Sequence, residues 1–271
     1  MVIDGRKIAG EIMERLKSLP KPKTFFAAFL VGDDASSVSF LKQKEKAAKL
    51  LGVDFRLYTL PKEIKNDELR GEVRKIAEHT TCGGVVVQLP LPEHLNSQYI
   101  LNVIPREKDI DVLGERALGA FYADRNPVVP PAVGVVQELF RVLNVNCQML
   151  RVAVVGLGPL VGKPISMWLM RQVRELRLLH KKSDIEILKD VDLVVTGAGK
   201  AGLVKPEMLK SGAAVIDFGY DGNKGDFDPD DSSSTLHDSR LAWYTPTPGG
   251  TGPILVAKVF ENFYKLNESK S

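Results

Sequence analysis

The sequence predicts an α/β fold made of two α/β domains with a cleft between them. Short apolar runs, which are typical of buried strands, alternate with amphipathic segments over nearly the whole chain. Such alternation indicates βαβ units, which form parallel sheets with helices on both faces. The segment 123–133 contains three prolines and is the expected hinge between the domains. The length of 271 residues is enough for one large or two small domains with sizeable cores.

Apolar runs predict the strands, and apolar residues at helical spacing predict the helices. In the first half we expect strand, helix, strand, helix and strand over 25–31, 38–51, 54–60, 67–79 and 84–88. In the second half we expect an amphipathic helix over 134–143, a strand over 151–155, a helix over 161–173 and strands over 177–180, 193–196 and 214–218. A last helix is expected over 254–266.

Composition excludes several classes of protein. The net charge of +3 is too small to indicate a nucleic-acid partner, and no apolar run is long enough to span a bilayer. The first residues lack a signal-peptide pattern, so we expect a cytoplasmic protein that binds neither nucleic acid nor membrane. The two cysteines and four histidines show no metal-ligand spacing. We therefore expect reduced thiols and no metal site.

The most informative stretch is Gln-Leu-Pro-Leu-Pro at 88–92, which follows the apolar run 85–87. A strand cannot continue through two closely spaced prolines. Gln88 is therefore expected at the carboxyl edge of the sheet, where open α/β sheets bind ligands. The segment 245–253 has too much glycine and proline for packing alone, and it precedes the last helix. For each segment, a rigid turn without a ligand is the alternative.

A glycine-rich turn connects the strand expected over 151–155 to the helix that follows. Gly156, Gly158 and Gly162 have the spacing G-x-G-x-x-x-G, one residue longer than the usual dinucleotide-binding pattern. Glycines let the backbone approach a pyrophosphate, whose charge the helix N-terminus stabilises. We therefore expect a Rossmann-type NAD(P)-binding domain here, with a simple tight turn as the alternative.

The next strand ends in His180, Lys181 and Lys182, where an acidic residue would indicate NAD. The lysine pair suits a 2′-phosphate and predicts NADP, with NAD possible; a solvated lysine pair is the alternative. Small residues at 197–199 again end a strand, where a cofactor could lie close to the backbone. The expected cofactor-binding residues are Gly156, Leu157, Gly158, Val161, Gly162, His180, Lys181, Lys182, Gly197, Ala198 and Gly199.

One lysine lies in an apolar stripe. On the expected helix 38–51, one side carries Phe40, Lys44, Ala47, Ala48 and Leu51. Burial at this position would lower the pKa of Lys44 and make it a proton carrier near neutral pH. The alternative is a side chain that extends from the stripe to solvent.

Five ordered motifs resemble those of the methylenetetrahydrofolate dehydrogenase/methenyltetrahydrofolate cyclohydrolase family. The segment 37–47 resembles its signature helix (Ser, two residues, Tyr-Val, two residues, Lys-x-Lys), and 88–92 is identical to its second signature. The segments 108–111, 156–164 and 245–253 resemble its Lys-Asp-Val-Asp, Gly-Arg-Ser-x-x-Val-Gly-x-Pro and Thr-Pro-Val-Pro-Gly-Gly-Val-Gly-Pro motifs. The order and spacing hold over essentially the whole chain, so it is identified as a divergent member of that family.

The resemblance implies a bifunctional enzyme of one-carbon metabolism. Such an enzyme oxidises 5,10-methylene-tetrahydrofolate with NADP to the methenyl cation and then hydrolyses this product to 10-formyl-tetrahydrofolate. As catalytic residues it implies Lys44, which handles protons, Gln88, which hydrogen-bonds and tunes the lysine, and Asp111, which binds the pterin. The implied substrate-binding residues are Phe40, which stacks on the folate, and Gln88, Leu89, Pro90, Asp111, Pro248, Gly249, Gly250, Gly252 and Pro253.

The resemblance also implies a domain division and a homodimer. Residues 1–131 are expected to form a folate-binding catalytic domain, to which the C-terminal helix within 249–271 returns. Residues 132–248 are expected to form the Rossmann-type NAD(P)-binding domain.

The chain departs from the family pattern at several positions. Phe40 replaces the usual tyrosine, and Leu157-Gly158 replaces Arg-Ser in the glycine turn. Val112 replaces the glycine after Asp111, so we expect that turn to differ. Two alternative functions are another two-domain NADP-dependent reductase, similar to shikimate dehydrogenase, and a non-catalytic nucleotide-binding regulator. The motif at 88–92 argues against the first, and the retained Lys44 and Asp111 argue against the second.

Overall fold

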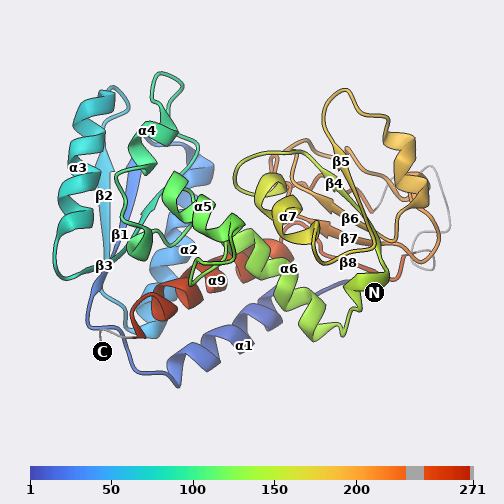
Figure 1. Cartoon of the computed structure of the whole chain (residues 1–271), viewed down its shortest axis with the longest axis horizontal. Coiled ribbons are helices and arrows are strands. Elements are labelled where there is room, and N and C mark those ends of the chain that lie inside the picture. Colours follow the sequence, from blue (N-terminus) through green and yellow to red (C-terminus); the bar gives the residue numbers. More distant parts are fainter. Residues whose placement is uncertain (230–240, 269–271) are drawn as a thin grey trace. The chain divides into compact units, whose positions relative to one another are not determined.

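The computed structural model describes residues 1–229 and 241–268, which form two compact units (Figure 1). The first unit comprises Gly10–Pro131 and the residues from Val256 onward. The second unit comprises Met1–Ala9 and Ala132–Leu255. Three helices, α1 (Gly5–Lys17), α6 (Pro131–Val142) and α9 (Thr251–Lys265), contribute residues to both units.

The first unit is built on a three-stranded parallel sheet with the order β2-β1-β3. Its strands are β1 (Phe25–Val31), β2 (Phe55–Leu60) and β3 (Cys82–Val87). Its helices, besides its parts of α1 and α9, are α2 (Ala35–Leu51), α3 (Asn66–Glu78), α4 (Ser97–Leu101) and α5 (Glu115–Tyr122).

Helices cover both faces of this sheet, which is why β1 is apolar at every position. Phe29 and its neighbours at alternate positions pack in one cluster with Leu69 and Val73 of α3. Leu30 points to the other face and packs in a cluster with Leu41 of α2. Figure 1 shows α2 and α3 on opposite sides of the sheet.

The C-terminal helix α9 belongs largely to the first unit. Its Phe260 and Phe263 contact the ring of Phe26 in β1, with centroid distances of 5.4 and 5.2 Å. After the helix, the buried Asn267 donates a hydrogen bond of 3.1 Å to the carbonyl of Gly83 in β3. Aromatic packing and a buried amide therefore attach this distant part of the chain to the first sheet.

The second unit contains a five-stranded parallel sheet with the order β5-β4-β6-β7-β8. Its strands are β4 (Arg151–Val155), β5 (Glu175–Leu179), β6 (Leu193–Thr196), β7 (Ala214–Asp217) and β8 (Trp243–Tyr244). Its helices, besides its parts of α1 and α9, are α6 (Pro131–Val142), which starts in the first unit, and α7 (Gly162–Leu169). Next to β8, Val2 forms a parallel bridge to Tyr244, so the start of the chain continues the sheet.

Strand order in the second sheet reverses at β4. The chain passes from β4 to β5 on one side, and β6 lies on the other side of β4. Open α/β sheets bind ligands at such a switch point, outside the carboxyl ends of the strands. The glycine turn follows β4 directly and therefore lies where this fold places a ligand.

The structure confirms the predicted α/β class with two domains and parallel sheets. Strands β1, β4 and β6 have the predicted bounds, whereas α7 ends at Leu169, four residues before the predicted end. Residues 170–174 form a turn instead, because the chain must reverse direction before β5 begins at Glu175. None of the described helices is both long and apolar enough to cross a membrane.

Candidate active site

Lys44 is buried on the inner face of α2. The helix starts at the N-cap Asp34, whose carboxylate accepts a 2.8 Å hydrogen bond from the Ser37 amide, and it ends at the left-handed Gly52. Within it, the buried residues are Ser37, Leu41, Lys44, Ala48 and Leu51, while Phe40 and Ala47 are half-buried. The Lys44 side chain is only 3% exposed. The structure therefore rules out the alternative in which this lysine extends to solvent.

Two side chains contact the Lys44 ammonium group. Its Nζ donates a hydrogen bond of 3.1 Å to Oε1 of Gln88, and it lies over the Phe40 ring at 5.0 Å from the centroid. An aromatic face attracts a cation at this distance. The protonated form thus has one amide acceptor and one ring face.

Gln88 is held at the end of β3, as predicted. Its backbone amide donates to the Phe29 carbonyl at 2.9 Å, which continues the pairing of β3 with β1. Its side-chain Nε2 donates to the carbonyl of Leu89 at 2.8 Å. This second bond occupies the amino end of the amide, so that the carbonyl end faces Lys44. Leu89 packs against the core of the first unit, and the Leu89–Pro90 peptide bond is cis.

Lys44 and Asp111 influence each other electrostatically. Burial lowers the pKa of Lys44, and the Asp111 carboxylate offsets part of that shift. Burial likewise raises the pKa of Asp111, and the charge of Lys44 offsets part of it. A lysine with a lowered pKa can accept and return a proton near neutral pH.

The turn that carries Asp111 is closed by a residue that the sequence prediction did not select. Asp109 is 2% exposed, and its Oδ2 accepts hydrogen bonds from the amides of Leu113 (3.0 Å) and Gly114 (2.8 Å). Burial is the main cause that raises the pKa of Asp109, to about 7, and nearby Asp111 adds to the shift. Its position in the segment 108–111, which resembles the Lys-Asp-Val-Asp motif of the family, was a signal that could have identified it.

Val112 adopts a backbone conformation that usually requires glycine. It is fully buried and has φ 56°, in the left-handed region. A branched side chain is strained there, at a cost on the order of 1–2 kcal/mol. Val112 therefore occupies a backbone conformation that glycine would adopt without strain. Contacts of the neighbouring residues hold the strained residue in place, including the hydrogen bonds that Asp109 accepts from Leu113 and Gly114.

Helix α9 supports the same turn. Asn262 is buried, and its Nδ2 donates to the carbonyls of Ile110 (2.9 Å) and Val129 (2.8 Å). Ile110 directly precedes Asp111, so this amide fixes the backbone beside the predicted pterin-binding residue. Nothing in the sequence near Asn262 marked it, because its partners are distant in the chain.

In the second unit, two of the three glycines in the turn after β4 are required by close packing. Gly156 has φ 85°, and a side chain there would lie 2.8 Å from the backbone of Ala198. At Gly162 an added Cβ would lie 1.8 Å from the Gly156 carbonyl oxygen. A Cβ on Gly158, by contrast, would meet no atom within 4 Å. Packing therefore does not explain Gly158, whereas a ligand close to the backbone would.

The predicted cofactor residues after β5 form a tight turn. The His180 amide donates to Ser183 Oγ at 3.0 Å, and the Lys182 amide donates to His180 Nδ1 at 3.1 Å. Both lysine side chains are exposed, and the structure gives them no ion pair among residues 1–229 and 241–268. The nearby loop Gly197–Gly199 packs against the glycine turn, since a Cβ on Gly197 would lie 2.6 Å from Val161.

The Pro-Gly-Gly segment folds tightly onto the start of α1. The Gly5 amide donates to the Gly249 carbonyl at 3.0 Å, and a Cβ on Gly5 would lie 1.8 Å from the Gly250 carbonyl oxygen. Gly249 itself has φ 100°. A Cβ on Gly252, however, would meet no atom within 4 Å. Close packing thus explains part of this glycine-rich segment and leaves Gly252 without a packing reason.

The predicted site residues divide between the two units. Phe40, Lys44, Gln88, Leu89, Pro90 and Asp111 lie in the first unit. The residues of the glycine turn, of the loops after β5 and β6, and of the segment 248–253 lie in the second unit. Among the described residues, no cluster of His, Cys, Asp and Glu side chains is suited to hold a metal ion.

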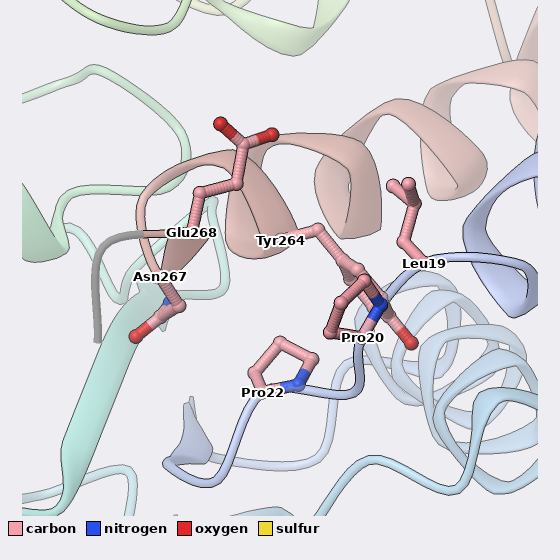
Figure 2. Close-up of a pocket in the computed structure, with 6 residues that line it drawn as sticks. All are labelled: Leu19, Pro20, Pro22, Tyr264, Asn267 and Glu268. Atoms are coloured by element: carbon pink, nitrogen blue, oxygen red, sulfur yellow. The ribbon is translucent and has the colours of Figure 1, made fainter. Parts of the chain in front are cut away.

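A small cavity in the first unit involves none of these residues. It lies between the segment after α1 and the end of α9 and is lined by Leu19, Pro20, Pro22, Tyr264, Asn267 and Glu268 (Figure 2). Its volume of about 70 Å³ is room for roughly two water molecules. It is too small for a folate or a nucleotide.

Two models of one protein family match this chain. Residues 3–111 match the family model of the tetrahydrofolate dehydrogenase/cyclohydrolase catalytic domain. Residues 130–271 match the model of the NAD(P)-binding domain of the same enzymes. The chain belongs to the tetrahydrofolate dehydrogenase/cyclohydrolase family. The second unit is accordingly an NAD(P)-binding domain, as the glycine turn predicted.

Relatives and solved structures of this family match over the full length. The bifunctional protein FolD of Bdellovibrio bacteriovorus is 32% identical over 100% of this chain and 98% of its own. The crystal structure of FolD from Campylobacter jejuni has a TM-score of 0.91 and 26% identity, covering 100% of this chain and 99% of that one. The Trypanosoma brucei enzyme, complexed with NADP and an inhibitor, has a TM-score of 0.90 and 30% identity, with 100% and 98% covered.

Proposed function

We propose that this chain oxidises 5,10-methylene-tetrahydrofolate with NADP and hydrolyses the 5,10-methenyl product to 10-formyl-tetrahydrofolate. Family membership over the full length supports both reactions. The observation that carries the hydrolytic half is the burial of Lys44 with Nζ hydrogen-bonded to Gln88. A buried lysine without a carboxylate in hydrogen-bond contact is costly, and folds retain such a group mainly for chemistry.

In the hydrolysis we assign Lys44 to proton transfer. Water adds to the methenyl carbon and loses a proton, and the bond from that carbon to N5 then breaks as N5 gains a proton. The lysine in its neutral form accepts the proton of the attacking water and returns it to N5, and the overall reaction releases one proton to solvent. Gln88 positions Nζ through the 3.1 Å hydrogen bond.

We assign Asp111 and Phe40 to binding of the folate. A carboxylate can accept hydrogen bonds from the N–H groups of a pterin, and charge assistance strengthens such bonds. Phe40 is half-buried beside Lys44, so part of its ring is available for stacking. Leu89, Pro90 and the residues Pro248, Gly249, Gly250, Gly252 and Pro253 are assigned to the substrate on the resemblance alone.

The second unit offers groups suited to NADP, which would supply the acceptor for the hydride that leaves the methylene carbon. The turn after β4 offers the open position at Gly158 and the N-terminus of α7, both suited to a pyrophosphate. The exposed Lys181 and Lys182 are suited to a 2′-phosphate, which agrees with the NADP complex of the Trypanosoma brucei enzyme. Hydride transfer itself requires that the nicotinamide ring and the ring of the folate substrate be positioned against each other, and it needs no side-chain acid.

Three further assignments complete the proposal. The first unit is the folate-binding catalytic domain, and the second unit is the NAD(P)-binding domain. A homodimer is proposed from the family resemblance. A cytoplasmic location is proposed as well, and the free thiols of Cys82 and Cys147 are compatible with a reducing compartment.

The test is a spectrophotometric assay of methenyl formation and decay. Purified protein is mixed with 5,10-methylene-tetrahydrofolate and either NADP or NAD, and separately with 5,10-methenyl-tetrahydrofolate alone. We expect formation with NADP and decay without any nicotinamide. Turnover of shikimate but not of folate would favour the reductase alternative, and binding of NADP without any folate turnover would favour the regulator.

A further inference from the structure

One buried carboxylate, that of Asp226, holds the loop that follows β6. Asp226 is fully buried, and Oδ2 accepts hydrogen bonds from Thr196 Oγ1 at 2.7 Å and from the Ala198 amide at 2.6 Å. Its Oδ1 accepts a bond of 2.7 Å from the Lys200 amide. Three donors on one loop thus converge on a single side chain that lies far along the sequence.

These bonds shape the part of the loop predicted to face the cofactor. The bonded positions 196, 198 and 200 bracket Gly197 and Gly199. Gly199 has φ 66°, and a Cβ there would meet no atom within 4 Å. The carboxylate therefore binds the inner side of the loop and leaves Gly199 facing open space.

The segment that carries Asp226 is itself fixed. The Phe227 amide donates to Oδ2 of the buried Asp217 at 3.0 Å, and the Gly219 amide donates to Oδ1 of Asp217 at 2.6 Å. Glycines give both carboxylates the space they need. A Cβ on Gly219 would lie 2.2 Å from the Asp226 carboxylate, and one on Gly225 would lie 2.0 Å from that of Asp217.

Two buried carboxylates so close in the structure are an expensive arrangement for folding alone. Burial and the charge of Asp226 raise the pKa of Asp217, to about 7, even though three backbone amides favour its ionised form. An apolar pair of similar size would fill the same space without that penalty. The specific gain from Asp226 is three directed bonds to one loop, which apolar side chains cannot make.

We propose that Asp226 is a positioning residue for the nicotinamide cofactor, which fixes the loop Thr196–Lys200 in the conformation that binds NADP. This inference rests on the proposed function. In Asp226→Asn, one carboxylate oxygen becomes an amino group, so at least one of the three donors faces another donor. We expect the Kd for NADP to rise about tenfold, because a hydrogen bond to a charged group is lost.

Calorimetric titration with NADP is the primary measurement. Asp221→Asn is the matched control, because it makes the same chemical change at an exposed side chain nearby. Hydrolysis of methenyl-tetrahydrofolate without nicotinamide is measured on each variant. We expect Asp226→Asn to weaken NADP binding and raise its KM while the hydrolytic rate stays within about twofold. Equal loss of both activities with unchanged NADP affinity would show that Asp226 only stabilises the fold.

A milder pair of variants keeps the test decisive if Asp226→Asn does not fold. Thr196→Val removes one donor with little change in shape, and Thr196→Ser retains the hydroxyl. We expect the valine variant to bind NADP about two- to fivefold more weakly, and the serine variant to restore most of that affinity. Equal affinities of both variants and the native protein would overturn the proposal. If the native protein itself fails to bind NADP, the proposed function fails instead.

Discussion

Lys44 Nζ lies 3.1 Å from Gln88 Oε1, and the two residues come from a helix and a strand end that are adjacent only in the folded first unit. The amide neutralises none of the lysine's charge, so burial dominates and lowers the lysine pKa. Gln88 supplies direction, because its other end is bonded to the Leu89 carbonyl. The pair can therefore hold a neutral amine in a fixed orientation.

Replacing Lys44 by methionine tests this pair. Lys44→Met should abolish methenyl hydrolysis and largely keep folate binding, because the position is needed for proton transfer and not for packing. The free energy of unfolding should stay the same or rise, since a desolvated charge is replaced by an apolar chain of similar length. Lys42→Met on the exposed side of the same helix is the control. Near-normal hydrolysis by Lys44→Met would refute the assignment.

Phe40→Tyr restores the hydroxyl that the family usually has. Folate affinity should change less than about twofold, because the stacking area is nearly the same. The hydrolytic rate or its pH optimum should change, since the Phe40 ring already lies 5.0 Å from Nζ and a hydroxyl adds a polar group beside it. A pH–rate profile measured for both proteins checks this. Identical profiles would mean that the side chain at position 40 does not affect proton transfer by Lys44.

At position 112 a glycine variant should be at least as stable as an alanine variant, although alanine usually gives the more stable protein. Both Val112→Gly and Val112→Ala leave a cavity at this buried position, and the cavity is larger for glycine. At φ 56°, however, glycine relieves backbone strain that alanine keeps, by on the order of 1 kcal/mol. The glycine variant should therefore be at least as stable as the alanine variant in urea unfolding. Greater stability of the alanine variant would show that the turn has relaxed.

Asp109 should make stability fall as pH rises. Its pKa is about 7 in the folded protein and near 3.8 when unfolded, so the folded state holds an extra proton between these values. The contribution is complete below about pH 4 and is lost through pH 7, with a slope of about 1.4 kcal/mol per pH unit. Asp109→Asn keeps an acceptor for Leu113 and Gly114 and should remove this part of the slope, leaving the part that Asp217 contributes. Urea unfolding between pH 5 and pH 8, followed by circular dichroism, measures it; an unchanged slope contradicts the assignment.

Lys181 and Lys182 should set the cofactor preference. Replacing both by alanine should weaken NADP binding roughly ten- to hundredfold and hardly affect NAD, because only the 2′-phosphate meets the lost charges. Raising the salt concentration should narrow the difference in the native protein, since both side chains are exposed. Equal binding of NAD and NADP by the native protein would show that the lysine pair does not recognise the phosphate.

The sequence predicted the local features well, because they depend on short-range patterns. The apolar runs located β1, β4 and β6 with the observed bounds, and helical spacing identified the stripe that contains Lys44. Spacing alone could not decide whether that lysine was buried. The decision depends on Gln88 and on the sheet beneath α2, which no local pattern contains.

What the sequence missed depends on contacts between distant residues. Asp226 and Asn262 each bond backbone groups far away in the chain, so neither belongs to a recognisable motif. Helix α1 was missed although its sequence is amphipathic. The left-handed backbone of Val112 could not be predicted from the sequence for a different reason. The preference of valine against this conformation costs only a few kcal/mol, and surrounding contacts can outweigh it.

The bridge between Val2 and Tyr244 has a consequence for biosynthesis. The first residues leave the ribosome early, but their strand partner is made only after nearly all of the chain has been translated. The core of the first unit likewise stays incomplete until Phe260 and Phe263 have been synthesised. Neither domain can therefore complete its core while the ribosome is still in the first half of the message. A nascent chain that stalls just after β7 presents two unfinished cores at once.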